Sequence, residues 1–253
     1  MSTRRLYRAR GFTLTELAVV FAIISLLLAA GLFTLSAQTD QRNFDETRRR
    51  VEAARDLLLG FAIVTGRLPC PATATSAGAE AITTPPNCDA TYGGFLPARS
   101  IGYQVVDTAG FAVDAWGNRL RYAVSSTTPS CTPAASAVPH FTNAANLRAN
   151  GITCQPNDLV VCQSWTGITA TTCGTAAAVT NQTTLVAIIF APGKNGALGT
   201  GGIDEAANVN GDRVFVWHTP TPVGSANGEF DDQMTWITVG ELYGRLVAAS
   251  ILP

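Results

Sequence analysis

The stretch GFTLTELAVVFAIISLLLAAG, residues 11–31, decides the fold of this chain. Four arginines precede it, and the 21 residues from Leu17 to Ala37 carry no charge. At about 1.5 Å per residue, a helix of this length crosses the roughly 30 Å hydrocarbon core of a bilayer. The positive-inside rule then places the N-terminus in the cytoplasm.

The small residue Gly11 distinguishes this segment from an ordinary secretory signal, in which a small-residue cleavage site follows a shorter apolar core. Gly11 stands before the apolar run, so cleavage there removes only the basic leader, residues 1–11, and leaves the helix on the mature chain. Glu16 is also unusual, because a carboxylate in an apolar helix costs on the order of a few kcal/mol unless it finds a partner.

The motif RGFTLTELAVVFAIISLLLAAG, residues 10–31, resembles the prepilin signal of type IV pilins and type II secretion pseudopilins. The resemblance implies cleavage by prepilin peptidase between Gly11 and Phe12, followed by N-methylation of Phe12. Glu16 matches the family's glutamate at the fifth mature position. We expect its carboxylate to pair with the new α-amino group of Phe12, in the same or a neighbouring subunit, and so to promote assembly.

The resemblance implies a structural subunit and not an enzyme, and we expect a minor or accessory subunit of a type IV pilus or type II secretion filament. The expected location is the prokaryotic inner membrane, with a cytoplasmic N-terminus and a periplasmic or extracellular head. The expected partners are other pilin or pseudopilin subunits, prepilin peptidase, the membrane and the assembly platform. A signal-anchored extracytoplasmic binding or enzymatic domain is the alternative, and the sequence does not distinguish a pilus from a secretion system.

The charge balance argues against a nucleic-acid-binding protein. The chain has 17 basic and 18 acidic residues, and removing the leader's four arginines leaves the mature form acidic. No basic footprint of the kind that binds nucleic acid is present. Contact with a surface, a secreted substrate or DNA at a filament tip stays open.

The six cysteines follow the apolar segment, and none forms a CxxC pair. Their spacing favours disulfides in an oxidising compartment over a zinc site. The sequence does not fix the connectivity, and we expect the sequence-local pairs Cys70–Cys88, Cys131–Cys154 and Cys162–Cys173.

The pattern along the chain predicts an α+β fold, in which a long N-terminal helix packs on an antiparallel sheet. The helix is expected from about Phe12 to Thr65, because Gly66 and Pro69 stop it. Its apolar stripe includes Phe44, Val51, Ala54, Leu58, Phe61 and Val64, and its arginines (Arg48, Arg49, Arg50, Arg55) are expected on a solvated face. The expected parts are a membrane or filament-core half (12–37), an amphipathic half (38–66) and a globular head (67–253) with a loop-rich insertion (125–182).

Dense β-branched and aromatic residues predict sheet strands in the head over 183–191, 213–218 and 233–238. The stretch DAWGNRLRYAV, residues 114–124, predicts a turn and an alternating strand, and it resembles the DPWGNPY element of major pseudopilins. Thr238 and Glu241 fit a capping box for a closing helix.

Two loops rich in Gly, Asn and Asp (191–212 and 224–232) separate these strands, and their acids are hard oxygen ligands suited to calcium. The second loop resembles the calcium loop of major pseudopilins, which implies Asp231 and Asp232 as ligands and Glu229 as a weaker candidate. Ordinary turn residues are the alternative interpretation.

No motif for catalysis is present. His140 and His218 are the only candidate bases, and neither accompanies a nucleophile motif. The glycines of GALGTGG lack the order of a phosphate-binding loop.

Overall fold

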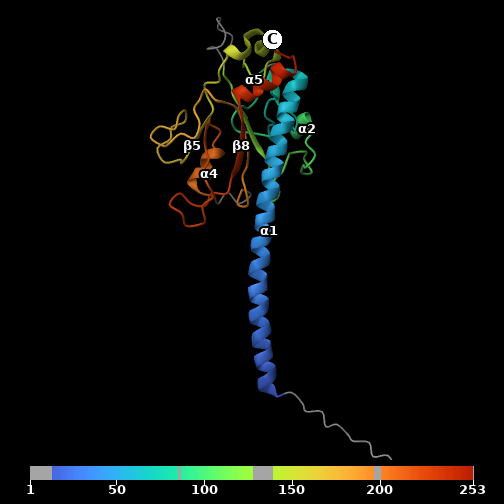
Figure 1. The fold of residues 1–253 in the computed structure, drawn as a ribbon, viewed down its shortest axis with the longest axis vertical. Coiled ribbons are helices and arrows are strands. Elements are labelled where there is room, and N and C mark those ends of the chain that lie inside the picture. The colour runs from blue at the N-terminus through green and yellow to red at the C-terminus, as the bar shows by residue number, and fades with distance from the viewer. Residues whose placement is uncertain (1–12, 85–86, 128–138, 197–200, 253) are drawn as a thin grey trace, which may run out of the picture. The chain divides into compact units, whose positions relative to one another are not determined.

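A computed structural model describes residues 13–84, 87–127, 139–196 and 201–252, without the side chains of residues 28–37. The chain divides into two units, residues 1–43 and residues 44–253, and each is described by itself. Helix α1 runs from Leu14 to Thr65 and contributes to both units (Figure 1). The second unit contains every other helix and strand of the described chain, and we call the part of it that follows α1 the head.

Helix α1 ends where the sequence predicts. Gly66 adopts a left-handed conformation with φ of +74°, and its N–H donates to the carbonyl of Ala62 at 2.8 Å. This is the usual C-terminal signal of a helix, and a glycine adopts it without steric cost. Pro69 follows outside the helix and cannot extend it.

The face of α1 that packs on the head is close to the predicted stripe but does not coincide with it. Val51, Ala54 and Leu58 are buried as predicted, whereas Val64 is 84% exposed. In the last turns of the helix the buried face includes Ala62, and Val64, two positions later, lies on the exposed side. The predicted solvated face is also wrong for Arg50 and Arg55, as these side chains are partly buried and bind the carbonyl groups of the head.

Four strands form the main sheet in the order β3-β4-β6-β8, with antiparallel pairing throughout. The predicted antiparallel sheet is therefore present, and helix α5 (Val239–Ala248) and the last turns of α1 lie close together beside it (Figure 1). The strands are β3 (Gly94–Phe95), β4 (Arg121–Val124), β6 (Leu185–Ala191) and β8 (Gln233–Thr238).

Strand β6 is the centre of the head because all seven of its residues are buried. Ala187 and Ile189 belong to the core formed with α1 and α5, whereas Ile188 and Phe190 belong to a second core on the opposite face of the sheet. Such a continuous apolar strand is typical of a sheet covered on both faces.

The second face is covered by a separate two-stranded parallel sheet, formed by β5 (Val160–Cys162) and β7 (Val214–Val216). The expectation that residues 213–218 join the antiparallel sheet is wrong. The short helix α4 (Ile203–Asn208) lies between β6 and β7, and the amide of Asn208 bonds both the N–H and the carbonyl of Val216. Asn208 thus satisfies these backbone groups of β7, while β5 pairs with the strand.

The remaining elements are short. Thr238 caps α5 by accepting a hydrogen bond from the N–H of Glu241 at 3.2 Å. Only this half of the expected capping box forms, because the carboxylate of Glu241 binds Arg55. These elements are β1 (Ile82–Thr84), β2 (Asn87–Cys88), α2 (Ala98–Ile101), α3 (Ala144–Asn150), a 3₁₀ turn (Gly151–Thr153) and α5 (Val239–Ala248).

Two of the three expected disulfides are present, Cys70–Cys88 and Cys162–Cys173. Cys154 is also disulfide-bonded, and the Cys131 end of the third expected pair lies outside the described residues. The bonded cysteines Cys88 and Cys162 lie in strands β2 and β5, so these disulfides join loops of the head to its strands.

Candidate functional site

The N-terminal candidate site begins with the first turn of α1. Thr13 precedes the helix, and its Oγ1 accepts a hydrogen bond from the N–H of Glu16 at 3.3 Å. The carboxylate of Glu16 accepts in return from the N–H of Thr13 at 2.9 Å and from its hydroxyl at 2.8 Å. This reciprocal arrangement is a capping box. It holds the acid at the start of the helix, while Gly11 and Phe12 lie outside the described residues.

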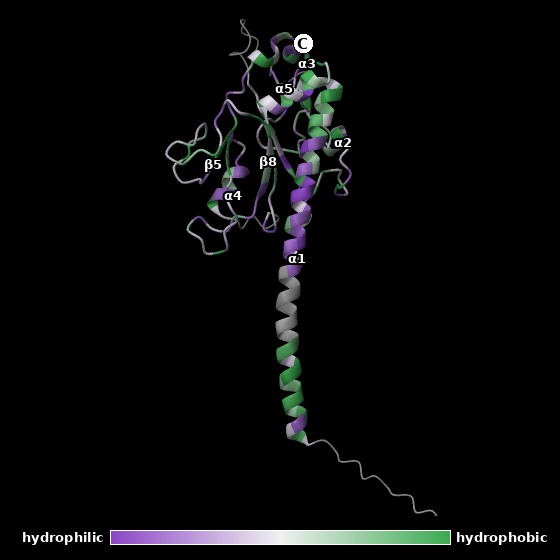
Figure 2. Ribbon diagram, in the orientation of Figure 1, coloured by the Kyte–Doolittle hydropathy of each residue, from purple (hydrophilic) through white to green (hydrophobic). Residues whose placement is uncertain are grey.

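The turns that follow expose apolar side chains in the single chain. Leu14 is 85% exposed and Leu26 is 73% exposed, and Figure 2 shows this part of α1 as largely hydrophobic. A surface of this kind normally marks contact with lipid or with another protein. Among the residues whose side chains are described, no helix has an apolar stretch long enough to cross a membrane.

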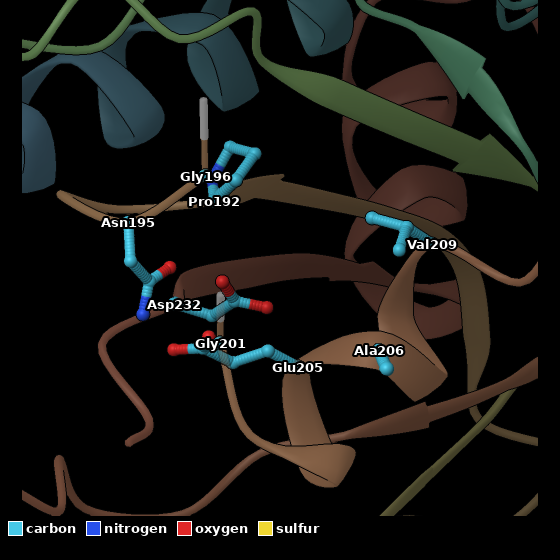
Figure 3. Close-up of a pocket in the computed structure, with 8 residues that line it drawn as sticks. All are labelled: Pro192, Asn195, Gly196, Gly201, Glu205, Ala206, Val209 and Asp232. Carbon is cyan, nitrogen blue, oxygen red and sulfur yellow. The ribbon is translucent and has the colours of Figure 1, made fainter. Parts of the chain in front are cut away.

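The second candidate site is a pocket lined by carboxylates in the head (Figure 3). Helix α4 contributes Glu205 to its lining and the residue before β8 contributes Asp232, while Asp231 lies within reach of both. One ligand oxygen from each of the three lies within 4.8 Å of the others, and all three residues are buried. Figure 3 shows the side chains of Asn195, Glu205 and Asp232 converging in this pocket. We call Glu205, Asp231 and Asp232 the carboxylate trio.

Two oxygens of the trio have no hydrogen-bond partner among the described residues. They are Oε2 of Glu205 and Oδ1 of Asp231. The other oxygen of each side chain is satisfied, since Glu205 accepts from the N–H of Asp231 at 2.5 Å and Asp231 accepts from the N–H of Lys194 at 2.8 Å. A buried acceptor without a partner costs folding free energy and requires an explanation. A bound cation is one such explanation.

Glycines make room for these two oxygens. A Cβ atom at Gly201 would lie 1.6 Å from Oε2 of Glu205, and one at Gly193 would lie 2.0 Å from Oδ1 of Asp231. Gly193 also has a φ of +72°, which side-chain-bearing residues rarely adopt. The loop therefore approaches the unpaired oxygens at the positions where a side chain would block them.

Burial raises the pKa of all three acids of the trio. The pKa of Glu205 rises to about 7, with the negative charge of Asp231 adding to the effect of burial. Burial likewise raises the pKa of Asp231 and places that of Asp232 well above its ordinary value. The neighbouring Asp114 has a pKa of about 6 for the same reason, and its Oδ2 also has no partner in the described chain. A divalent cation at the trio would offset this cost of burying charge.

The donor set fits a hard cation such as calcium, which takes oxygen ligands at flexible positions. Asp231 and Asp232 occur together as the sequence indicates, but the third member of the trio is Glu205 and not Glu229. Glu229 instead accepts a hydrogen bond from the amide of Asn195 at 3.3 Å. Glu205 is one of the acids of residues 191–212 that the sequence offers as oxygen ligands, but it was not singled out because this segment read as a loop. The stretch IDEAAN instead forms α4 and turns Glu205 into the pocket.

The two histidines occupy structural positions. His140 is buried, and its Nε2 lies 3.0 Å from the hydroxyl of Tyr243. His218 stacks on Phe230 and directs its Nε2 to the carboxylate of Asp204 at 3.3 Å. Neither ring has a serine, threonine or cysteine side chain among its hydrogen-bond partners in the described chain, so the geometry gives neither histidine a nucleophile to activate.

Comparison with known proteins identifies the N-terminal segment. The family model of the prokaryotic N-terminal methylation motif matches residues 6–32. The chain carries a type IV pilin-type signal. No curated protein and no solved structure matches the chain. The pilin-type signal indicates a structural, membrane-anchored subunit that is a substrate of prepilin peptidase and assembles with other pilin subunits.

Proposed function

We propose that this protein is a minor or accessory subunit of a type IV pilus or type II secretion filament. The observation that carries the proposal is the methylation motif over residues 6–32, which coincides with the start of a 52-residue helix. In this proposal the chain is inserted in the inner membrane, cleaved between Gly11 and Phe12, and N-methylated at Phe12. The helix then enters the filament.

Two features of the described first turns support assembly through the helix. The apolar side chains are highly exposed in the single chain, and packing among neighbouring helices would bury them. The capping box fixes the carboxylate of Glu16 at the helix start, four residues after Phe12, whose α-amino group cleavage would create. An ion pair between the two groups would neutralise both charges in an apolar environment.

The accessory role is supported by the head. Disulfide-bonded loops extend it, and a second, parallel sheet covers the face of the main sheet opposite α1. These additions provide a surface that the filament backbone itself does not require.

We also propose that the carboxylate trio binds calcium in the head. Three buried acids converge, two of their oxygens have no hydrogen-bond partner in the described chain, and glycines let the loop backbone pack against those oxygens. Glu205, Asp231 and Asp232 would hold the ion, which would fix α4 and the turn at Gly193 to the start of β8.

The N-terminus of the protein isolated from its native host tests the main proposal. We expect intact mass and N-terminal sequencing to give a chain that begins at methylated Phe12. Gly11→Leu should block cleavage and retain Met1, because a large side chain occupies the cleavage boundary. An uncut wild-type chain, or cleavage after Ala37, would contradict the proposal and favour a signal-anchored domain.

A further inference from the structure

A groove of about 300 Å³ lies on the head between α1 and the segment that follows β7. Arg48 and Glu52 line it from α1, Trp217 lines it from the opposite side, and Gln233 contributes from the start of β8. Its volume falls at the lower end of the range for small-molecule sites. Asp232 lines both this groove and the carboxylate pocket, so the two hollows adjoin but are distinct.

The aromatic side of the groove is held in place. Trp217 is 36% exposed, and its backbone N–H donates to the carbonyl of Cys162 at 2.9 Å. Its indole packs against Trp236 with ring centroids 5.9 Å apart and an interplanar angle of 90°. Because the rings are perpendicular, Trp236 leaves at least one face of the Trp217 indole uncovered. An indole fixed in this way is a rigid surface for an apolar ligand face.

The polar side of the groove has unused hydrogen-bonding capacity. Within the described chain, the side chains of Arg48 and Glu52 make no hydrogen bond or ion pair, although they stand one helical turn apart. The order with the cation first is the less favourable one for pairing along a helix. By contrast, Glu46 of the preceding turn pairs with both Arg49 and Arg50. A planar guanidinium and a planar carboxylate are therefore available side by side.

The amide of Gln233 adds a third planar polar group. Its Nε2 donates to the backbone carbonyl of Phe44 at 3.1 Å, which orients the side chain. Guanidinium, carboxylate and amide groups each bind two adjacent polar atoms of a ligand. Together they match pairs of neighbouring hydroxyl groups.

The charges and the aromatic surface together select a class of ligand. The charges of Arg48 and Glu52 offset one another, so an anionic ligand meets the carboxylate and a cationic ligand meets the guanidinium. The other acid of the lining, Asp232, is buried and accepts a hydrogen bond from the amide of Asn208. A pyranose ring is uncharged, has one face of C–H groups for an indole, and carries adjacent hydroxyls at its edge. We propose that this groove binds a neutral saccharide, with the sugar stacked on Trp217 and hydrogen-bonded by Arg48 and Glu52. The proposal does not depend on filament assembly.

The test is isothermal titration of the full chain with cellotriose, maltotriose and tri-N-acetylchitotriose. The chain should be held in lauryldimethylamine oxide, because alkyl glycoside detergents would compete for the groove. We expect saturable binding of at least one of these sugars, which Trp217→Ala weakens by about tenfold or more. Trp165→Ala is the matched control, since Trp165 is 46% exposed but does not line the groove. The affinity of Trp165→Ala for the sugar should equal that of the wild type.

Glu52→Ala provides a second variant that retains the fold, because this side chain is exposed on a helix surface. It should also weaken binding, and thermal melting should show both groove variants folded. Absence of saturable heat for all three sugars up to about 10 mM overturns the proposal. Binding that Trp217→Ala and Glu52→Ala leave unchanged overturns it as well.

Discussion

The Nη1 atom of Arg50 lies 2.6 Å from the backbone carbonyl oxygen of Asp114 and donates a hydrogen bond to it. The same guanidinium pairs with Glu46 at 2.9 Å, and the hydroxyl of Thr47 accepts from the N–H of Ala115. This group of contacts attaches α1 to the turn that the DAWGN stretch forms. The helix is thus held to the head by hydrogen bonds as well as by its apolar face.

Arg50→Ala should destabilise the head by about 1–3 kcal/mol, because it leaves a carbonyl without its charged donor. Arg49→Ala is the matched control, since Arg49 also pairs with Glu46 but is 70% exposed and makes no bond to the head in the described chain. Its effect should stay within about 0.5 kcal/mol. Denaturant titration of both variants measures the difference, and equal effects would show that only the pairing with Glu46 matters.

Removing calcium should lower the melting temperature of the full chain in detergent. Saturating calcium is expected to add about 3 kcal/mol at a hundred times its dissociation constant. Glu205→Gln should abolish this gain, and it should raise the melting temperature in chelator because it removes a buried charge. Glu229→Gln should keep the gain. Magnesium should substitute poorly, as it requires tighter octahedral geometry. Melting that chelator leaves unchanged would assign the trio a role without metal.

Glu16→Gln distinguishes the capping role of this side chain from its proposed ion pair. The glutamine amide can still form the capping box with Thr13, but it cannot form an ion pair with the α-amino group of Phe12. We expect membrane insertion to persist and the amount of protein in sheared filaments to fall, as for Glu16→Ala. Thr13→Val tests the cap alone. Filament yields that Glu16→Gln leaves normal would show that capping, and not charge, is what assembly requires.

Acid should weaken the head through His140. Tyr243 uses its hydroxyl proton for the carbonyl of Cys154 at 2.6 Å, so Nε2 of His140 carries the proton in their shared hydrogen bond. Burial lowers the pKa of His140 from 6.5 to about 4. Between these pH values the unfolded chain binds the proton and the folded chain does not, which favours unfolding. The contribution of His140 to the free energy of unfolding is therefore complete above pH 6.5 and is lost as the pH falls towards 4. The loss amounts to about 3 kcal/mol.

His140→Gln should remove this part of the pH dependence, whereas His218→Gln should retain it. The acids with raised pKa act in the opposite direction, because they bind protons more tightly in the folded chain. The difference between wild type and His140→Gln, measured by denaturant titration from about pH 7 to pH 4, isolates the histidine. A difference that does not change with pH would contradict the assignment.

The sequence predicts the parts of this fold that depend on local pattern. The end of α1 at Thr65 follows from Gly66, and the alternation of Leu120, Tyr122 and Val124 places these residues in one core, while Ala123 between them is buried in the core on the other face of the sheet. The parallel pairing of β7 with β5 was not predictable, because strand propensity carries no information about the partner strand. It depends on Asn208, a polar residue whose amide matches the backbone of Val216 only after the chain has folded.

The carboxylate site likewise combines residues that a local sequence pattern indicates with one that only the folded chain brings in. The adjacent acids Asp231 and Asp232 are visible in a glycine-rich loop, but Glu205 joins them from 26 residues away through a helix of six residues. Helices this short lack the periodic pattern that identifies longer ones. The arginines of α1 were likewise ambiguous, because sequence spacing does not show which exposed positions meet a carbonyl group.

The complete burial of β6 has a consequence for the order of events during synthesis. Its neighbour β8 begins at Gln233, some forty residues after β6 has been made, and β7 is made in between. Until those residues emerge, the edge of β6 that pairs with β8 stays open on a run of seven apolar residues of high β-propensity, the kind of segment that self-associates. A chain released early, without its last twenty residues, would therefore be a substrate for chaperones and proteases and not a smaller head.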